Sequence, residues 1–97
     1  MGYVKDIGGT EAALLRASPE FDGKRVLEIG CGDARLTWLY AGRAASVLGI
    51  DPEEDEIAVA RAATPPGLAG RVTFDVGTAE DLSKTEGFDV AFLSWSL

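Results

Sequence analysis

The sequence of 97 residues contains no histidine and a single cysteine, Cys31. Without histidine, a zinc site or a Ser-His-Asp relay is all but excluded, and we expect no metal site. One cysteine cannot form an internal disulfide, which is typical of a reducing, cytoplasmic setting. The N-terminus lacks a charged leader followed by a long apolar run, so no signal peptide is expected. No stretch is long enough to span a bilayer, so no membrane partner is expected.

Basic residues are also scarce. Nine Lys and Arg stand against sixteen Asp and Glu, which gives a formal net charge of -7. An acidic surface repels phosphate backbones, so nucleic acid is not expected as a partner. Hydrophobic residues make up 46% of the chain, which is enough for the core of one small domain.

Apolar runs alternate with segments of helical spacing. Strands are predicted at 25–29, 45–50, 71–76 and 88–93, and helices at 10–19, 33–42 and from Pro52 to Thr64. The expected buried faces are Leu36, Leu39 and Tyr40 on one helix, and Ile57, Ala60 and Ala63 (or Val59 and Ala63) on the next. Residues 1–8 are expected to be a loose lead-in. This order predicts an α/β fold, a parallel sheet with helices on both faces.

The predicted strand 88–93 is the last element of this sheet. Its apolar residues have nothing after them to cover them, and open apolar edges favour association. Residues 1–97 are therefore expected to form a single domain that is truncated after its fourth strand. The alternative is a homo-oligomer or a partner chain that joins through the open edge.

A glycine turn, Gly30 to Gly32, follows the first predicted strand directly. Glycine permits a tight turn and close approach of a ligand, and a helix start would present free N–H groups there. Asp51 lies 19 residues beyond Gly32, at the end of the next strand. In a parallel sheet this carboxylate comes beside the turn, where it can accept hydrogen bonds from ribose hydroxyls. The pattern predicts a ribose-bearing ligand.

Two residues argue against a dinucleotide. Arg35 stands where the G-x-G-x-x-G pattern requires its third glycine, which disfavours a nicotinamide-dependent dehydrogenase. Glu28, two residues before Gly30, would oppose a pyrophosphate but could hold a cationic amino group.

Taken together, these residues resemble the class I methyltransferases that use S-adenosylmethionine. The first motif of that family matches Glu28 to Ala34, with Ala34 in place of the third glycine, and its second motif matches Asp51. A third region matches 77–82, with Thr78 where the family usually has Asp, and a fourth matches 88–93. The resemblance covers about residues 23–96.

The resemblance implies a Rossmann-like fold, S-adenosyl-L-methionine as cofactor and methyl transfer to a small-molecule acceptor. The implied cofactor-binding residues are Glu28, Gly30, Cys31 and Gly32 at the methionine part, Asp51 at the ribose, Pro52, Thr78, Ala79 and Glu80 around the adenine, and Ser94 near the sulfonium. Displacement at a sulfonium mainly requires alignment of donor and acceptor, so no catalytic residue is assigned. The alternative function is a non-catalytic nucleotide-fold module that assembles through its fourth strand.

Overall fold

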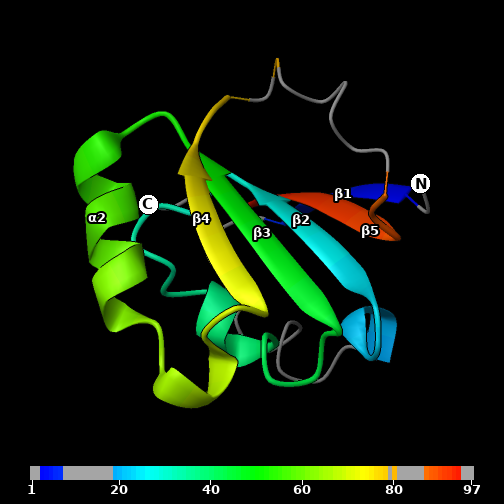
Figure 1. Ribbon diagram of the computed structural model, residues 1–97. Helices are drawn as coiled ribbons and strands as arrows, with labels where there is room; N and C mark the ends of the chain where they lie inside the picture. The colour runs from blue at the N-terminus through cyan, green and yellow to red at the C-terminus, as the bar shows by residue number, and fades with distance from the viewer. Residues whose placement is uncertain (1–2, 8–18, 79, 81–86, 95–97) are drawn as a thin grey trace.

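A parallel five-stranded sheet forms the centre of the molecule in the computed structural model, which describes residues 3–7, 19–78, 80 and 87–94 (Figure 1). Its strands are β1 (Tyr3–Ile7), β2 (Arg25–Ile29), β3 (Ser46–Asp51), β4 (Val72–Val76) and β5 (Val90–Ser94). They lie in the order β1-β5-β2-β3-β4, and each neighbouring pair is parallel. The predicted α/β fold with a parallel sheet is confirmed.

The strand β2 lies at the point where the chain changes direction across the sheet. From β2 the chain moves to β3 on one side, while β5 lies on its other side. Ile29 is in register with both Ile50 and Leu93, so the carboxyl ends of three strands meet at one place. Open α/β sheets bind ligands at the carboxyl ends of their strands, beside such a switch point.

One α-helix, α2 (Glu54–Ala63), is present in the described part of the chain, with three short 3-10 helices, η1 (Pro19–Phe21), η2 (Thr37–Leu39) and η3 (Pro66–Leu68). The helix α2 begins with three acidic residues, which suit the positive end of its dipole. It buries Ile57 and Ala60, whereas Ala63 and Val59 are exposed. The predicted buried face of this helix is therefore correct for Ile57 and Ala60 and wrong for Ala63 and for the alternative Val59.

Apolar side chains fill both faces of the sheet, because neighbouring residues of a strand point to opposite sides. The face under α2 carries the larger cluster, which includes Val26, Tyr40, Val47, Ile57, Val72 and Phe74. The other face carries Leu27, Ile29, Ile50 and Ala91, with Leu48, Phe88 and Leu93 packed against them. Among the helices that the structure describes, none has the length and apolar character to cross a membrane.

An ion pair ties the amino ends of β2 and β5 together. The guanidinium Nη2 of Arg25 lies 3.0 Å from Oδ1 of Asp89, and the backbone N–H of Arg25 donates to Oδ2 at 3.0 Å. The N–H of Asp89 donates in return to the carbonyl of Arg25 at 2.8 Å. These contacts lower the pKa of the Asp89 carboxyl to about 2. They join the amino ends of the two strands whose other ends form the site.

The helix predicted over 33–42 is wrong. This segment consists of turns and η2, and Ala34 has a φ of 76°. An L-residue in the left-handed region interrupts an α-helix at its start. Asp33 caps no α-helix either, because none follows it in this segment; its Oδ1 accepts the N–H of Arg35 at 3.1 Å within a turn. The helix predicted over 10–19 lies outside the described residues except at Pro19, which begins η1.

The lead-in expected over residues 1–8 is also wrong within 3–7. This segment forms β1, which pairs in parallel with β5 from Tyr3 opposite Val90 to Ile7 opposite Ser94. The sequence Tyr-Val-Lys-Asp-Ile is rich in the branched and aromatic residues that favour strands. The strand β5 is consequently interior, and the open edge expected there is covered. The edge strands of the described sheet are β1 and β4.

Truncation of Ile57 to alanine tests the packing of α2. The side chain is 1% exposed in the main cluster, so Ile57→Ala should lower the free energy of unfolding by about 2–5 kcal/mol in urea titrations. Val59→Ala is the matched control on the same helix, since Val59 is 52% exposed, and it should change stability by less than about 0.5 kcal/mol. Equal losses from both variants would contradict this placement of α2.

Candidate functional site

The glycine turn lies between the carboxyl ends of β3 and β5. Gly30 has a φ of 81°, and a Cβ at that position would lie 2.5 Å from the backbone oxygen of Ser94. The N–H groups of Gly30 and Cys31 both donate to the carbonyl of Ile50, at 2.8 and 3.0 Å. Glycine is required at position 30 because both the backbone conformation and the space exclude a side chain.

Asp51, the last residue of β3, joins the turn to the start of α2. Its Oδ2 accepts the N–H of Gly32 at 2.9 Å, and its Oδ1 accepts the N–H of Glu53 at 2.9 Å. The side chain is nearly buried, at 8% exposure. Each carboxylate oxygen can accept a further hydrogen bond, so Asp51 retains acceptor capacity for a ligand. The turn and the carboxylate thus converge, as the sequence predicted.

The turn does not present free amides, contrary to the expectation from its glycines. The N–H groups of residues 30, 31 and 32 are all taken by the carbonyl of Ile50 and the carboxylate of Asp51. The expected helix start is also missing, for the reason given at Ala34. A pyrophosphate is bound by free N–H groups and a helix dipole. This turn offers neither in the described residues, which argues against a dinucleotide independently of Arg35.

A fully buried carboxyl, that of Glu28, lies on β2 just before the turn. Its Oε1 accepts the hydroxyl of Thr37 at 2.7 Å and the hydroxyl of Tyr40 at 2.5 Å. Its Oε2 has no hydrogen-bond partner among the residues that the structure describes. Ser94, buried at the end of β5, favours the charged form of this carboxyl through its side chain. Glu28 is thus held on one side and unpaired on the other.

Burial controls the protonation of this cluster. It raises the pKa of Glu28 above its ordinary value of 4.5, although hydrogen bonds from Tyr40, Thr37 and Ser94 oppose the rise. Burial and the charges of Glu28 and Asp51 raise the pKa of the Cys31 thiol far above its usual range. Cys31 is therefore no thiolate nucleophile.

Sequence reasoning missed Thr37 and Tyr40. The available signal was Glu28 itself, because an acid inside an apolar strand requires buried hydrogen-bond donors. The two donors follow it by nine and twelve residues. The predicted helix contained both residues, and its buried face was Leu36, Leu39 and Tyr40. Thr37 lay off that buried face, so it was not expected to contact Glu28.

The expected adenine-side residues lie at the ends of β3 and β4. The N–H of Gly77 donates to the carbonyl of Asp51 at 3.0 Å, which places the segment after β4 beside the acid. Within that segment the N–H of Glu80 donates to Thr78 Oγ1 at 3.2 Å, and both side chains are exposed. Pro52 is exposed as well. Ala79 lies outside the described residues.

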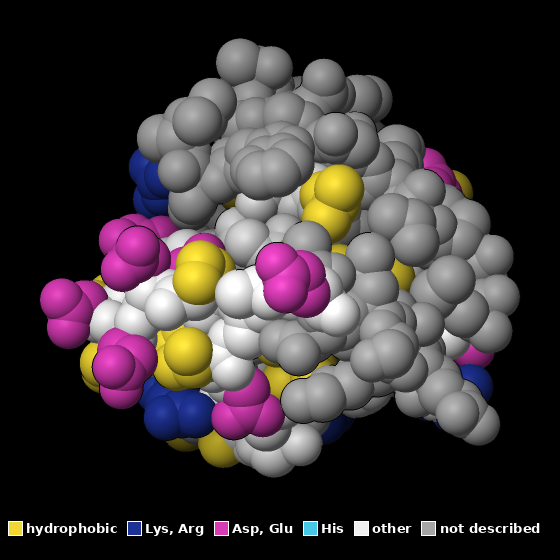
Figure 2. Space-filling view, turned by 90° about the horizontal axis from the view of Figure 1, so that it is seen from above, with side chains coloured by type: hydrophobic (Ala, Val, Ile, Leu, Met, Phe, Trp, Pro, Cys, Tyr) yellow, Lys and Arg dark blue, Asp and Glu magenta, His cyan; other side chains and the backbone are white. Residues whose placement is uncertain are grey.

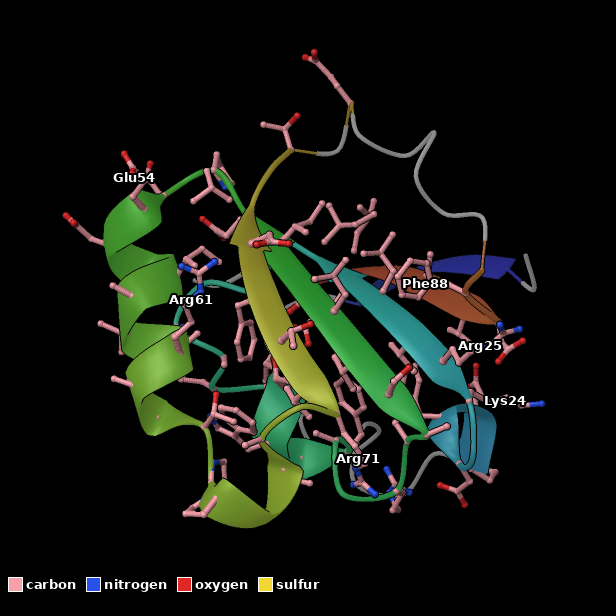
Figure 3. All side chains as sticks on the ribbon, in the orientation of Figure 1. Lys24, Arg25, Glu54, Arg61, Arg71 and Phe88 are labelled. Carbon is pink, nitrogen blue, oxygen red and sulfur yellow. The ribbon has the colours of Figure 1, made fainter. Side chains whose placement is uncertain are left out.

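Charged side chains lie at both ends of the sheet. Lys24, Arg25 and Arg71 lie at the amino ends of the strands, and Glu54 lies at the opposite end, where α2 begins (Figure 3). A view onto the carboxyl ends shows acidic side chains gathered on the side of α2 (Figure 2). The carboxyl end of the sheet is therefore acidic in the part described, which favours a cationic ligand over a phosphate.

A separate open groove of about 600 Å³ lies along the edge strand β4. It is lined by Arg61, Thr64, Ala69, Gly70, Val72, Thr73, Phe74 and Asp75. Arg61 reaches from α2 toward β4 (Figure 3) and donates from Nη2 to the carbonyl of Phe74 at 2.7 Å. None of its lining residues belongs to the glycine turn or to Asp51, so the groove is distinct from the candidate site.

Substitution of Gly30 tests the close contact of the turn with β5. Gly30→Ala should lower the free energy of unfolding by more than about 2 kcal/mol, because it adds a contact with the Ser94 backbone to an unfavourable φ. Gly23→Ala is the control, since Gly23 has a φ of 69° and nothing within 4 Å of its Cβ position. It should lose about 1 kcal/mol. The same loss in both would show that the contact with Ser94 is absent.

Stability against pH tests the buried carboxyl. Since the pKa of Glu28 is raised in the folded state, the folded protein holds this proton above pH 4.5 while the unfolded chain releases it. The free energy of unfolding therefore falls as pH rises through that window. Glu28→Gln does not titrate, so its stability relative to the wild type should increase as pH rises above about 4.5. Parallel profiles of unfolding free energy against pH for the two proteins would refute a raised pKa of Glu28. Asp89 titrates in both proteins, so its contribution cancels in the difference.

Comparison with known proteins identifies the family of this site. The family model described as "Methyltransferase domain" matches residues 26–97. A ubiquinone biosynthesis O-methyltransferase from Azorhizobium caulinodans is 38% identical over 96 residues, which are 93% of this chain and 36% of that enzyme. A magnesium-protoporphyrin O-methyltransferase from Rhodobacter capsulatus is 37% identical over 68 residues, covering 70% of this chain and 30% of that enzyme.

A solved structure agrees with these relatives. An S-adenosylmethionine dependent methyltransferase from Mesorhizobium loti superposes with a TM-score of 0.65 and 34% identity, over 88% of this chain and 39% of that one. The chain therefore spans about a third of the length of the proteins that it matches.

Proposed function

Because the chain belongs to the methyltransferase domain family, we propose that it is the cofactor-binding part of an S-adenosylmethionine-dependent methyltransferase. The transferred methyl group goes to a small-molecule acceptor in this proposal. The relatives carry names of O-methyltransferases that act in ubiquinone biosynthesis and on magnesium-protoporphyrin, which supports an oxygen atom as the acceptor. A cytoplasmic location remains a prediction from the single cysteine.

One observation carries the choice of ligand. The backbone N–H groups of the glycine turn donate hydrogen bonds within the protein, and the carboxyls of Asp51 and Glu28 lie near the turn. A ligand that suits this arrangement offers hydroxyl donors and a positive charge rather than a pyrophosphate. S-adenosylmethionine carries ribose hydroxyls, an ammonium group and a sulfonium. The donor set therefore fits this cofactor.

Each residue of the site would have one task. The carboxylate of Asp51 would accept the ribose hydroxyls with the lone pairs that Gly32 and Glu53 leave free. The backbone after β4, from Gly77 to Glu80, would border the adenine together with Pro52. The turn at Gly30 would allow the methionine part to approach the backbone.

The carboxyl of Glu28 and the end of β5 complete this assignment. Glu28 would pair with the ammonium group, and Ser94 would lie near the sulfonium. When bound, the cofactor supplies a methyl group on a good leaving group, so the protein contributes mainly alignment. The buried hydrogen bonds of Glu28 serve that purpose, because they hold the carboxyl in one orientation.

The alternative functions have less support. An assembly module joined through the fourth strand required an open edge at β5, and β1 occupies that edge. A nicotinamide-dependent dehydrogenase required free amides at the turn, and those are bound. The methyltransferase proposal requires neither feature.

Removal of the Asp51 carboxylate tests the proposal. Asp51→Ala should weaken binding of S-adenosylhomocysteine in isothermal titration calorimetry by about 1–3 kcal/mol, which is typical of losing a charged hydrogen-bond partner. Asp55→Ala, in the exposed first turn of α2, is the control and should bind as the wild type does. Circular dichroism of both variants checks that each remains folded. Undiminished affinity in Asp51→Ala would exclude Asp51 from the site, and heat on titration with NAD instead would overturn the choice of cofactor.

A further inference from the structure

The two oxygens of the Glu28 carboxyl differ in their surroundings. Oε1 receives two hydroxyls, from Thr37 at 2.7 Å and from Tyr40 at 2.5 Å. Oε2 is equally buried and has no partner among the described residues. A buried unpaired carboxylate oxygen costs free energy, so a native protein that contains one calls for a reason.

The unpaired oxygen belongs to a carboxyl that flanks the proposed cofactor site. Glu28 and Asp51 both raise the pKa of the Cys31 thiol, which stands in the glycine turn. Both carboxyls therefore lie near the same turn. Both oxygens of Asp51 already accept a backbone N–H group. Glu28 receives hydroxyl donors instead.

No cation compensates the charge of Glu28 within the described structure. The groups that act on it are the hydroxyls of Tyr40, Thr37 and Ser94. The other titratable groups of the cluster, Cys31 and Asp51, are a neutral thiol and a second acid. Burial therefore favours the protonated carboxyl in the free protein. A positive charge brought in by a ligand would reverse that preference.

We propose that Thr37 and Tyr40 are positioning residues that hold Glu28 by Oε1, and that Oε2 receives the ammonium group of the cofactor as Glu28 gives up a proton. This inference rests on the proposed function. The O–H bond of the carboxyl breaks and its proton passes to solvent, while the ammonium keeps its own protons. The carboxylate that remains is paired on both oxygens, by two hydroxyls and by the ammonium. Cofactor binding is thereby coupled to proton release.

Calorimetry with two ligands tests the coupling. S-adenosylhomocysteine and adenosine are each titrated into the chain in buffers of different ionisation enthalpy, from about pH 5 to about pH 7, where an α-amino group stays charged. S-adenosylhomocysteine should release protons, and the number released should fall as pH rises through the pKa of Glu28. Adenosine has no ammonium group and should release none. Equal proton counts for the two ligands would overturn the proposal.

Conservative variants test the positioning role. Tyr40→Phe keeps the ring that packs 4.7 Å from that of Phe21, and Thr37→Val keeps the shape of the side chain. Each removes one hydroxyl that favours the carboxylate of Glu28, so its pKa should rise and proton release should persist to higher pH. Affinity for S-adenosylhomocysteine near pH 7 should fall roughly three- to thirtyfold, with adenosine affinity unchanged. An equal loss for both ligands would show a merely structural role and refute the proposal.

The controls separate this inference from the proposed function. Glu28→Gln should bind S-adenosylhomocysteine without releasing a proton at any pH tested. If neither ligand binds the wild type, the cofactor assignment itself is wrong. If both bind, and the wild type and Glu28→Gln release the same number of protons, the cofactor assignment stands and the role of Glu28 is refuted.

Discussion

The structure of the site depends on the hydrogen bonds that the end of β3 accepts from the backbone N–H groups of the glycine turn. The carbonyl of Ile50 accepts two of them and the carboxylate of Asp51 a third, while the second oxygen of Asp51 accepts the N–H of Glu53. These bonds fix the turn, the strand end and the entry to α2 as one unit. Buried amides need acceptors, and a ligand that came and went could not supply them in the free protein.

This arrangement explains which parts of the fold the sequence predicts well. The runs at 25–29 and 45–50 are mostly apolar and are followed directly by Gly30 and Asp51, so they can be recognised as strands without a distant partner. The helix α2 follows from its acidic first turn and the prolines that end it. The meeting of Gly32 with Asp51 then follows from parallel pairing of adjacent strands, since their carboxyl ends lie at the same edge.

The failed predictions share a physical cause, which is tertiary contact at a distance. Nothing in the spacing of Leu36 and Tyr40 reveals that Ala34 adopts a left-handed φ or that Thr37 turns inward to a carboxyl on β2. Likewise, the pairing of β1 with β5 joins residues that are 87 positions apart, such as Tyr3 and Val90. Local periodicity contains no information about such contacts. The acid at position 28, inside an apolar strand, did indicate that buried hydrogen-bond donors were needed.

The same acid sharpens the distinction between this turn and a phosphate-binding loop. Both follow a parallel strand and both use glycine, but a phosphate loop leaves its N–H groups free and stabilises negative charge. Here the N–H groups are bonded within the protein, and two acids, Asp51 and Glu28, lie near them. Reversal of the local charge changes the preferred ligand from an anion to a cation without changing the order of the strands. The ligand preference of the turn therefore depends on which groups accept hydrogen bonds from its backbone N–H groups. The spacing of the glycines alone does not determine those acceptors.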